Sequence, residues 1–281
     1  MKTVKGLHEK MGTFENANTS FHQAARCKRY TNEVLAFSMV KEEELLRATE
    51  EIQNLTYRQG EYKIFKVFEP KERLIMALPF YDRVVQHMIC NAIQPVFENG
   101  FYYHSYACRS GKGMHAASDT LYQWMYETEV KQGLRMYAFK GDISKYFASI
   151  PHDKLKDENR RYIGDKKALM LMDDIIDHNG ILPDGVGIPV GNLTSQLFAN
   201  VYGNKLDKFC KHVLHIPYFV RYMDDFIILS DDLEQLKEWV KRIEEFLENE
   251  MLLHINPKST ILYAGNGIDF CGYIHYADHK K

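Results

Sequence analysis

Apolar residues recur every three or four positions in several stretches of the chain, which is the spacing of one face of a helix. In the stretch 40–57, this spacing places Leu45, Ile52 and Leu55 on the same side. The same pattern predicts further helices over residues 81–97, 114–130, 169–180 and 233–251. These segments predict a substantial helical content.

A second kind of helix signal is a boundary residue rather than a periodicity. The helix over 169–180 is expected to end at Gly180. A glycine-bearing loop from residue 187 leads into another long helix, with Thr194 or Ser195 as its N-cap.

Strand patterns lie between the helices. Residues 62–80 alternate apolar and polar side chains around the turn sequence EPKE, which predicts a hairpin. Residues 136–155 are typical of a strand, a turn and the start of a helix. The chain closes with strand-like stretches at 255–264 and 267–277. Helices mixed with mainly antiparallel strands predict an α+β architecture.

The apolar stretch 218–230 predicts two short buried strands joined as a hairpin, and it contains two adjacent aspartates, Asp224 and Asp225. A buried carboxylate is unfavourable unless it is paired or binds a metal. A third aspartate, Asp142, ends another apolar strand. Three carboxylates on two strands are suited to binding two Mg²⁺ ions. The alternative is that each segment is a tight turn held by local hydrogen bonds.

Composition excludes several classes of protein. The chain has 281 residues, enough for one large domain or two or three subdomains, with 45% hydrophobic and 26% charged residues. No apolar run approaches the ~18 residues of a membrane span, and the N-terminus lacks the apolar core of a signal peptide. Five dispersed cysteines without a CxxC motif indicate reduced thiols and a cytoplasmic protein.

Several motifs in order now resemble a known family. They read PKERLIMALPFYDRVVQ, SYACRSGKG, GDISKYF, GIPVGNLTSQ, YMDD, NPKS and DFCGY. Over roughly residues 57–276 the chain resembles prokaryotic reverse transcriptases of the group II intron and retroelement branch. The resemblance implies a right-hand polymerase fold, with an antiparallel palm sheet backed by helices. It implies an RNA-directed DNA polymerase, encoded by a bacterium or phage.

The resemblance also implies roles for individual residues. Asp142, Asp224 and Asp225 match the catalytic aspartates, and with Ile143 they are the implied ligands of two Mg²⁺ ions, for which Mn²⁺ can substitute. The implied nucleotide-binding residues are Lys71, Arg73, Phe147, Val190, Gly191, Gln196 and Lys258. The implied template and primer contacts are Arg109, Lys112, Tyr222, Met223, Cys271 and Gly272.

Two of these positions have plain structural alternatives. Phe147 matches an aromatic gate that excludes a 2′-hydroxyl from the incoming sugar, but an aromatic residue there is also typical of a core. Lys71 and Arg73 match a cationic hairpin that binds triphosphate, since a guanidinium can bind phosphate oxygens bidentately. Exposed hairpin charges without any ligand are common as well.

One motif departs from most of the family. Where most reverse transcriptases have Gln-Gly-x-x-x-Ser-Pro, this chain has Val190 for the glutamine and Gln196 for the proline. That pattern resembles the enzymes of diversity-generating retroelements, which copy template adenines unfaithfully. Alternatives are a reverse transcriptase of phage defence or another retroelement, a template-independent nucleotidyl transferase on the same palm, and a non-enzymatic nucleic-acid scaffold.

The same resemblance predicts an organisation along the chain. We expect an N-terminal extension at 1–40, fingers at 41–113, palm at 114–152, fingers or connecting segment at 153–194, and palm at 195–281. A helical thumb is expected to be absent from this chain. The expected partners are template RNA, a DNA or RNA primer and dNTPs. Because the net charge is −2, a basic accessory protein or missing thumb is expected to supply positive surface.

Overall fold

The computed structural model describes residues 3–68 and 72–281, and its elements group into two units that each take two stretches of the chain. The first unit holds Met1–Gly100 and Pro151–Phe198, and the second holds Phe101–Ile150 and Ala199–Lys281. Each unit has its own buried residues. The assignment of segments to fingers and palm stays a prediction.

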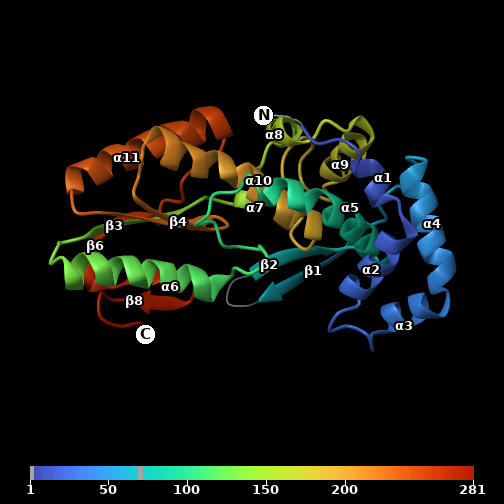
Figure 1. The fold of residues 1–281 in the computed structure, drawn as a ribbon, viewed down its shortest axis with the longest axis horizontal. Coiled ribbons are helices and arrows are strands. Elements are labelled where there is room, and N and C mark those ends of the chain that lie inside the picture. Colours follow the sequence, from blue (N-terminus) through green and yellow to red (C-terminus); the bar gives the residue numbers. More distant parts are fainter. Residues whose placement is uncertain (1–2, 69–71) are drawn as a thin grey trace. The chain divides into compact units, whose positions relative to one another are not determined.

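Helix α5 (Phe80–Glu98) is the central helix of the first unit, because apolar residues cover most of its circumference. Val84, Val85, Met88 and Ile89 are all fully buried on it. Helices α1, α2 and α3 pack against it, and Figure 1 shows them gathered with α4 along one side. The other helices of this unit are α1 (Leu7–Met11), α2 (Phe14–Ala24), α3 (Asn32–Met39), α4 (Lys41–Gln53), α8 (His152–Tyr162) and α9 (Lys166–Asp177).

Helices α1, α2 and α3 occupy the N-terminal 40 residues, where the pattern predicted no element. An aromatic cluster holds α2 and α3 to α5, with the Phe21 ring 5.6 Å from Phe37 and 6.0 Å from Phe80, centroid to centroid. Phe37 and Phe80 lie 5.1 Å apart, edge to face. The helices are therefore fixed by contacts with a distant segment rather than by a strong local pattern.

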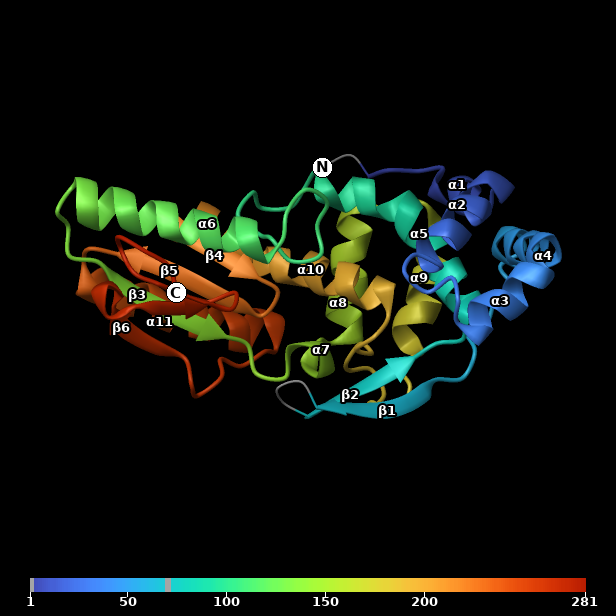
Figure 2. The same ribbon diagram turned by 90° about the horizontal axis from the view of Figure 1, so that it is seen from below.

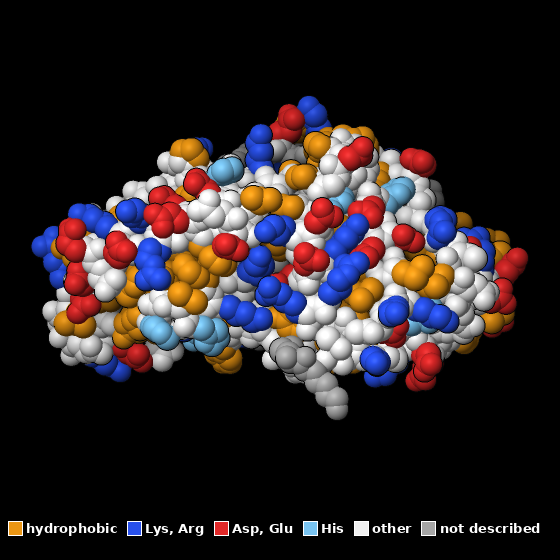
Figure 3. All heavy atoms as spheres, turned by 90° about the horizontal axis from the view of Figure 1, so that it is seen from above, with side chains coloured by type: hydrophobic (Ala, Val, Ile, Leu, Met, Phe, Trp, Pro, Cys, Tyr) orange, Lys and Arg blue, Asp and Glu red, His pale blue; other side chains and the backbone are white. Residues whose placement is uncertain are grey.

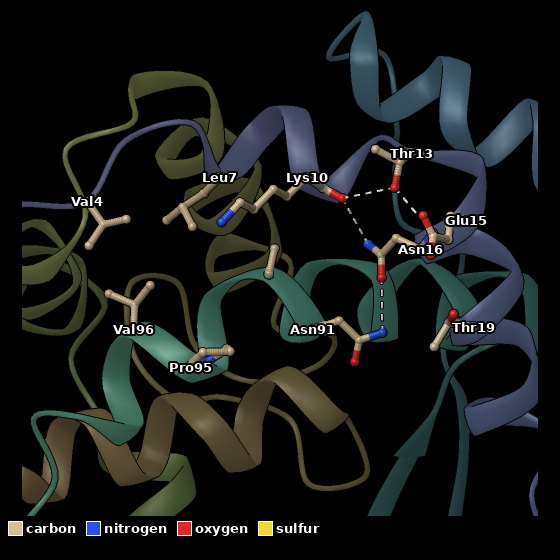
Figure 4. Close-up of a pocket in the computed structure, with 11 residues that line it drawn as sticks. Val4, Leu7, Lys10, Thr13, Glu15, Asn16, Thr19, Asn91, Pro95 and Val96 are labelled. Carbon is tan, nitrogen blue, oxygen red and sulfur yellow. Dashed lines mark hydrogen bonds between the residues drawn. The ribbon is translucent and has the colours of Figure 1, made fainter.

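A polar contact also joins α2 to α5. The Asn16 side-chain amide donates to the Met88 carbonyl at 2.9 Å, and the Asn91 amide donates to Asn16 Oδ1 at 3.1 Å. Figure 4 shows these two asparagines facing each other on one side of a groove of about 560 Å³. Both amide groups thus donate to acceptors at this contact, which allows polar side chains between two helices.

The predicted hairpin at 62–80 is confirmed as β1 (Lys63–Phe68) paired antiparallel with β2 (Glu72–Ala77). Its connecting residues 69–71 lie outside the described part of the chain, and so does the predicted site residue Lys71. The C-terminal end of β2 is hydrogen-bonded to the loop before α10, because Met76 N–H donates to the Val190 carbonyl at 3.0 Å.

An antiparallel sheet with the strand order β4-β5-β3-β6 is the centre of the second unit. Its strands are β3 (Tyr137–Asp142), β4 (Tyr218–Tyr222), β5 (Asp225–Ser230) and β6 (Thr260–Tyr263). Figure 2 shows β3 and β5 side by side. The sheet and its helices confirm the predicted α+β architecture.

Both faces of this sheet are covered, which explains the continuous apolar run at 218–230. On one face, Ala138, Val220 and Ile227 pack against helix α6 (Met114–Met125). On the other face, the Phe139 ring lies 5.8 Å from Phe226. Helix α11 (Leu233–Phe246) packs against β3 and β5, and Figure 1 shows α11 and α6 on opposite sides of the sheet.

The remaining elements are shorter or complete the helices. α6 and α11 each continue as a π-helical segment, Tyr126–Lys131 and Leu247–Met251. The others are α7 (Tyr146–Ser149), α10 (Leu193–Lys208) with the π-helical segment Phe209–Val213, the 3-10 turn Ala264–Asn266, β7 (Ile268–Phe270) and β8 (Tyr273–His275). Within the described part of the chain, no helix is both long and apolar enough to cross a bilayer.

Two predicted boundaries are wrong. α10 begins at Leu193, so neither Thr194 nor Ser195 is its N-cap; instead Gln86 accepts the Leu193 N–H at 3.0 Å. α9 ends at Asp177 before Gly180, because the Asn179 side chain bonds to the loop that follows. The strand-like stretch 267–277 is confirmed as two short paired strands.

Gly141 offers a test of this packing, because a Cβ atom there would lie 2.3 Å from the Phe226 ring. We expect Gly141→Ala to lower the free energy of unfolding by about 1–3 kcal/mol through overpacking. Urea denaturation of the variant measures this. Adding Phe226→Leu should recover part of the loss, and purely additive effects of the two changes would contradict direct contact.

Candidate active site

The strand register brings the predicted aspartates together. Asp142, the last residue of β3, lies directly opposite Asp225, the first residue of β5. Directly opposite residues have Cβ atoms about 4.5–5.5 Å apart and on the same face of the sheet. Asp224 adjoins them, because its carbonyl accepts the Ile143 N–H at 3.2 Å. The carboxylate-bearing segments therefore meet at one end of the sheet.

A tight turn between β4 and β5 carries Met223 and Asp224. Met223 has a φ of +60°, a left-handed conformation that is unusual for a residue with a side chain. Its side chain is buried. Tyr222 pairs with Asp225 across this turn and is half-buried. Asp224 thus lies in the turn and Asp225 begins β5, and both side chains are half-buried.

The charges at this site repel one another. Burial, together with the neighbouring carboxylates of Asp224 and Asp142, raises the pKa of Asp225 to about 6, and Lys140 acts in the opposite direction. A bound cation would relieve this repulsion, and carboxylate oxygens are the donors that Mg²⁺ prefers. In the described part of the chain, no three His, Cys, Asp or Glu side chains stand in metal-binding geometry, so the three aspartates would converge on a cation only when it binds.

The segment before β6 fixes the third aspartate. Asn256 Nδ2 donates to Asp142 Oδ2 at 2.6 Å, and Asp142 N–H donates to Ser259 Oγ at 3.0 Å. The sequence singled out Lys258 between them, which is exposed and whose N–H donates to Asn256 Oδ1. Asn256 and Ser259 are the residues that sequence reasoning missed, although Asn and Ser beside a proline are typical turn signals.

Four other predicted residues of the second unit lie next to the sheet or in short elements around it. Phe147 lies in α7, half-buried, with its ring 5.9 Å from that of the fully buried Tyr146. Ile143 follows Asp142 and is buried, so only its backbone is available to a ligand. Cys271 and Gly272, with φ of +52° and +80°, form the turn between β7 and β8.

The basic residues of the SYACRSGKG motif bind their own loop. Arg109 Nη1 donates to the carbonyls of Tyr102 and Ser105, both at 2.7 Å. Lys112 Nζ lies 3.9 Å from the centre of the Tyr103 ring and contacts the Tyr103 carbonyl. Both cations therefore order this loop, and their role toward template stays a prediction.

The other predicted residues belong to the first unit. Arg73 is exposed on β2, opposite Val67. Val190 is half-buried, and Gly191 has a φ of +124° where a Cβ would lie 2.7 Å from the Met76 carbonyl oxygen. Glycine is therefore required at 191.

Gln196 lies in a hollow that the sequence did not predict. It is exposed in a cavity of about 170 Å³. The cavity is also lined by Lys28, Arg83, Gln86 and His87. Arg83 is ion-paired with Glu33, so Lys28 is the cation beside the glutamine amides in this hollow.

The raised pKa of Asp225 gives a pH prediction. A carboxyl group whose pKa rises from 3.8 to about 6 on folding stabilises the metal-free protein at low pH, and this contribution is lost as the pH rises through 6. In EDTA, the wild type should therefore lose more thermal stability than Asp225→Asn between pH 4.5 and 7.5. Parallel melting-temperature curves for the two proteins would exclude this coupling.

Comparison with known proteins gives a family and relatives. A family model described as reverse transcriptase (RNA-dependent DNA polymerase) matches residues 66–275. Protein YkfC of Escherichia coli K12 is 25% identical over 238 residues, covering 68% of this chain and 60% of that protein. An uncharacterized 91 kDa protein in the cob intron of Schizosaccharomyces pombe is 29% identical over 137 residues, covering 47% of this chain and 16% of its own.

Among solved structures, telomerase from Candida albicans in complex with a TWJ fragment of telomeric RNA has a similar fold. The TM-score is 0.57 at 12% identity, covering 81% of this chain and 47% of that one. This likeness confirms the predicted polymerase fold and concerns the fold alone. The chain spans 60% or less of the length of the proteins it matches here.

Proposed function

The chain belongs to the reverse transcriptase (RNA-dependent DNA polymerase) family, and from this premise we propose that it is an RNA-directed DNA polymerase. It would extend the 3′-hydroxyl of a DNA or RNA primer with dNTPs on an RNA template. The observation that carries the proposal is the register of β3 and β5, which sets Asp142 opposite Asp225 beside the turn residue Asp224.

Asp142, Asp224 and Asp225 are the residues that would hold the divalent ions, Mg²⁺ or in its place Mn²⁺. When bound, two such ions lower the pKa of the attacking 3′-hydroxyl and neutralise the charge on the leaving pyrophosphate. Asn256 keeps the Asp142 carboxylate in one orientation through the 2.6 Å hydrogen bond. Ile143 would contribute its backbone at the same place.

The remaining predicted residues would bind nucleotide, template and primer. Phe147 would lie under the sugar and leave no room for a 2′-hydroxyl. Arg73 and Lys71 would bind the triphosphate, and Lys258 would add positive charge. The Cys271–Gly272 turn would contact the primer strand, with Tyr222 and Met223 beside it. Arg109 and Lys112 would hold the loop nearest the template.

Primer extension tests this function. With a defined RNA template, Mg²⁺ and four dNTPs, we expect template-dependent cDNA from the wild type and a loss of roughly 100-fold or more in Asp224→Asn, because several kcal/mol of charge stabilisation are removed. Asp231→Asn is the matched control, since Asp231 belongs to an exposed adjacent pair.

Two results would contradict the assignment. Equal extension by Asp224→Asn would exclude the aspartate site. Template-independent addition of nucleotides, lost in the same variant, would instead identify a nucleotidyl transferase on this palm.

We further propose that the enzyme is error-prone at template adenines, as in a diversity-generating retroelement. The support is Val190, which stands where a glutamine could hydrogen-bond at the nascent pair. Rejection based on hydrogen bonds discriminates more strongly than shape alone, so a valine at this position relaxes fidelity. The main alternative role is phage defence, which the same chemistry would serve.

Fidelity is measured by sequencing the cDNA. Val190→Gln should lower misincorporation opposite template adenine by roughly 3- to 10-fold, through the hydrogen bonds that it restores. Val186→Gln, a half-buried valine of the same loop, is the control and should leave the error spectrum unchanged. An unaltered spectrum in Val190→Gln would exclude this role for Val190.

A basic accessory protein is the partner that we propose for nucleic-acid binding. The net charge is −2, and Figure 3 shows Lys and Arg side chains interspersed with Asp and Glu over one face. Affinity for a phosphate backbone depends on the number of phosphates that cations neutralise. A partner with excess positive charge would therefore strengthen template binding.

A further inference from the structure

Arg221, on β4, is a buried cation that the proposed mechanism does not use. Successive residues of a strand point to opposite faces, so Arg221 lies on the α11 face while Tyr222 lies on the α6 face with Asp225. The guanidinium is fully buried. It therefore contacts no substrate and reaches the aspartate turn from the opposite face of the sheet.

The guanidinium has hydrogen-bond partners on three sides. Nε and Nη2 donate to the two carboxylate oxygens of Asp207 on α10, at 2.6 and 2.7 Å. Nη2 also donates to Ser105 Oγ at 3.0 Å. Nη1 donates to the carbonyl of Met223 at 2.8 Å. One rigid, planar group thus connects helix α10 to the turn that carries Asp224.

The neighbouring residues keep this group in place. A Cβ atom at Gly203 would lie 2.7 Å from Nη1, so α10 has a glycine where the guanidinium approaches its backbone. Tyr146 lies against the same point, and its hydroxyl donates to the Ala199 carbonyl at 2.7 Å. Since Tyr146 follows Asp142 closely in the chain, both aspartate-bearing segments abut the same buried group.

The Met223 carbonyl is the contact that matters for chemistry. Met223 has the left-handed φ of +60°, a conformation that persists when surrounding structure holds it. Burial lowers the pKa of Arg221 and Asp207 raises it, with a net rise, so the donor stays charged at any pH in which the protein is folded. A lysine could bind Asp207 or Met223 but lacks the fork that binds both.

We propose that Arg221 is a positioning residue that fixes the Met223 carbonyl and thereby aims the carboxylates of Asp224 and Asp225. The inference rests on the proposed function for its consequence in catalysis. Its geometric part, the orientation of the carboxylates toward a divalent cation, is independent of which nucleic acid is copied.

Binding of Mn²⁺ to the metal-free chain tests the proposal without any polymerase assay. The binding is measured as the loss of the EPR signal of free Mn²⁺. Arg221→Lys should weaken Mn²⁺ binding by roughly 10- to 100-fold, the effect typical of losing a group that orients a ligand. In primer extension kcat should fall by a similar factor, while KM for dNTP changes less than about twofold.

Two further variants separate positioning from stability. Gly203→Ala places a methyl group against Nη1 and displaces it from Met223 without removing charge, so it should weaken Mn²⁺ binding too. Tyr202→Phe is the control on the same helix, because it removes a buried hydrogen bond to the Met251 carbonyl and does not involve the turn. It should lower the melting temperature and leave Mn²⁺ affinity unchanged.

The outcomes are distinct. Wild-type Mn²⁺ affinity in folded Arg221→Lys and Gly203→Ala would overturn the proposal, and so would an equal loss in Tyr202→Phe. If Arg221→Lys does not fold, Gly203→Ala decides. No Mn²⁺ binding by the wild type would overturn it together with the metal site. If the variants bind Mn²⁺ more weakly than the wild type but the wild type extends no primer, the positioning role of Arg221 is supported. The proposed polymerase activity is then refuted.

Discussion

The in-register pairing of β3 with β5 is the constraint on which the candidate site depends. Antiparallel pairing places Asp142 opposite Asp225, and shifting the register by one residue would turn one of these side chains to the other face. The register is held because apolar residues of both strands are buried on both faces, between α6 and α11. Packing of the whole second unit therefore determines the separation of the carboxylates.

Negative charge at the end of such a sheet requires compensation nearby. Asn256 and Ser259 bind the Asp142 segment from one side, and Arg221 binds the turn from the other. Replacing a buried ion pair by apolar residues is often neutral or stabilising, so the Arg221–Asp207 pair is better explained by specificity of conformation than by stability. The same reasoning applies to Gly203, since glycine within a helix is destabilising relative to alanine.

Similarity to a telomerase at 12% identity shows how little of the sequence this fold needs. A sheet covered on two faces accepts many apolar side chains if their volume and alternation are kept. A site is less tolerant, because carboxylates, turn and supporting hydrogen bonds must keep their geometry. Short motifs in a fixed order therefore identify the family, while most of the remaining chain is free to change.

The sequence by itself determined the α+β class, the hairpins at 62–80 and 218–230, and the main amphipathic helices. It also singled out the aspartates that lie together. These features are predictable because the periodicity of apolar residues, and carboxylates within an apolar stretch, are local properties of the sequence. The sequence did not predict α1, α2 and α3, and the cluster of Phe21, Phe37 and Phe80 that holds α2 and α3 to α5 forms between distant segments. It misplaced the start of α10, where Gln86 from another helix binds the first N–H. It also missed Asn256 and Arg221, since Asn256 binds Asp142 and Arg221 binds Ser105, each more than 100 residues away along the chain. Only the tertiary structure decides such contacts, because a hydrogen bond depends on the distance between two groups in space and not on their separation in sequence.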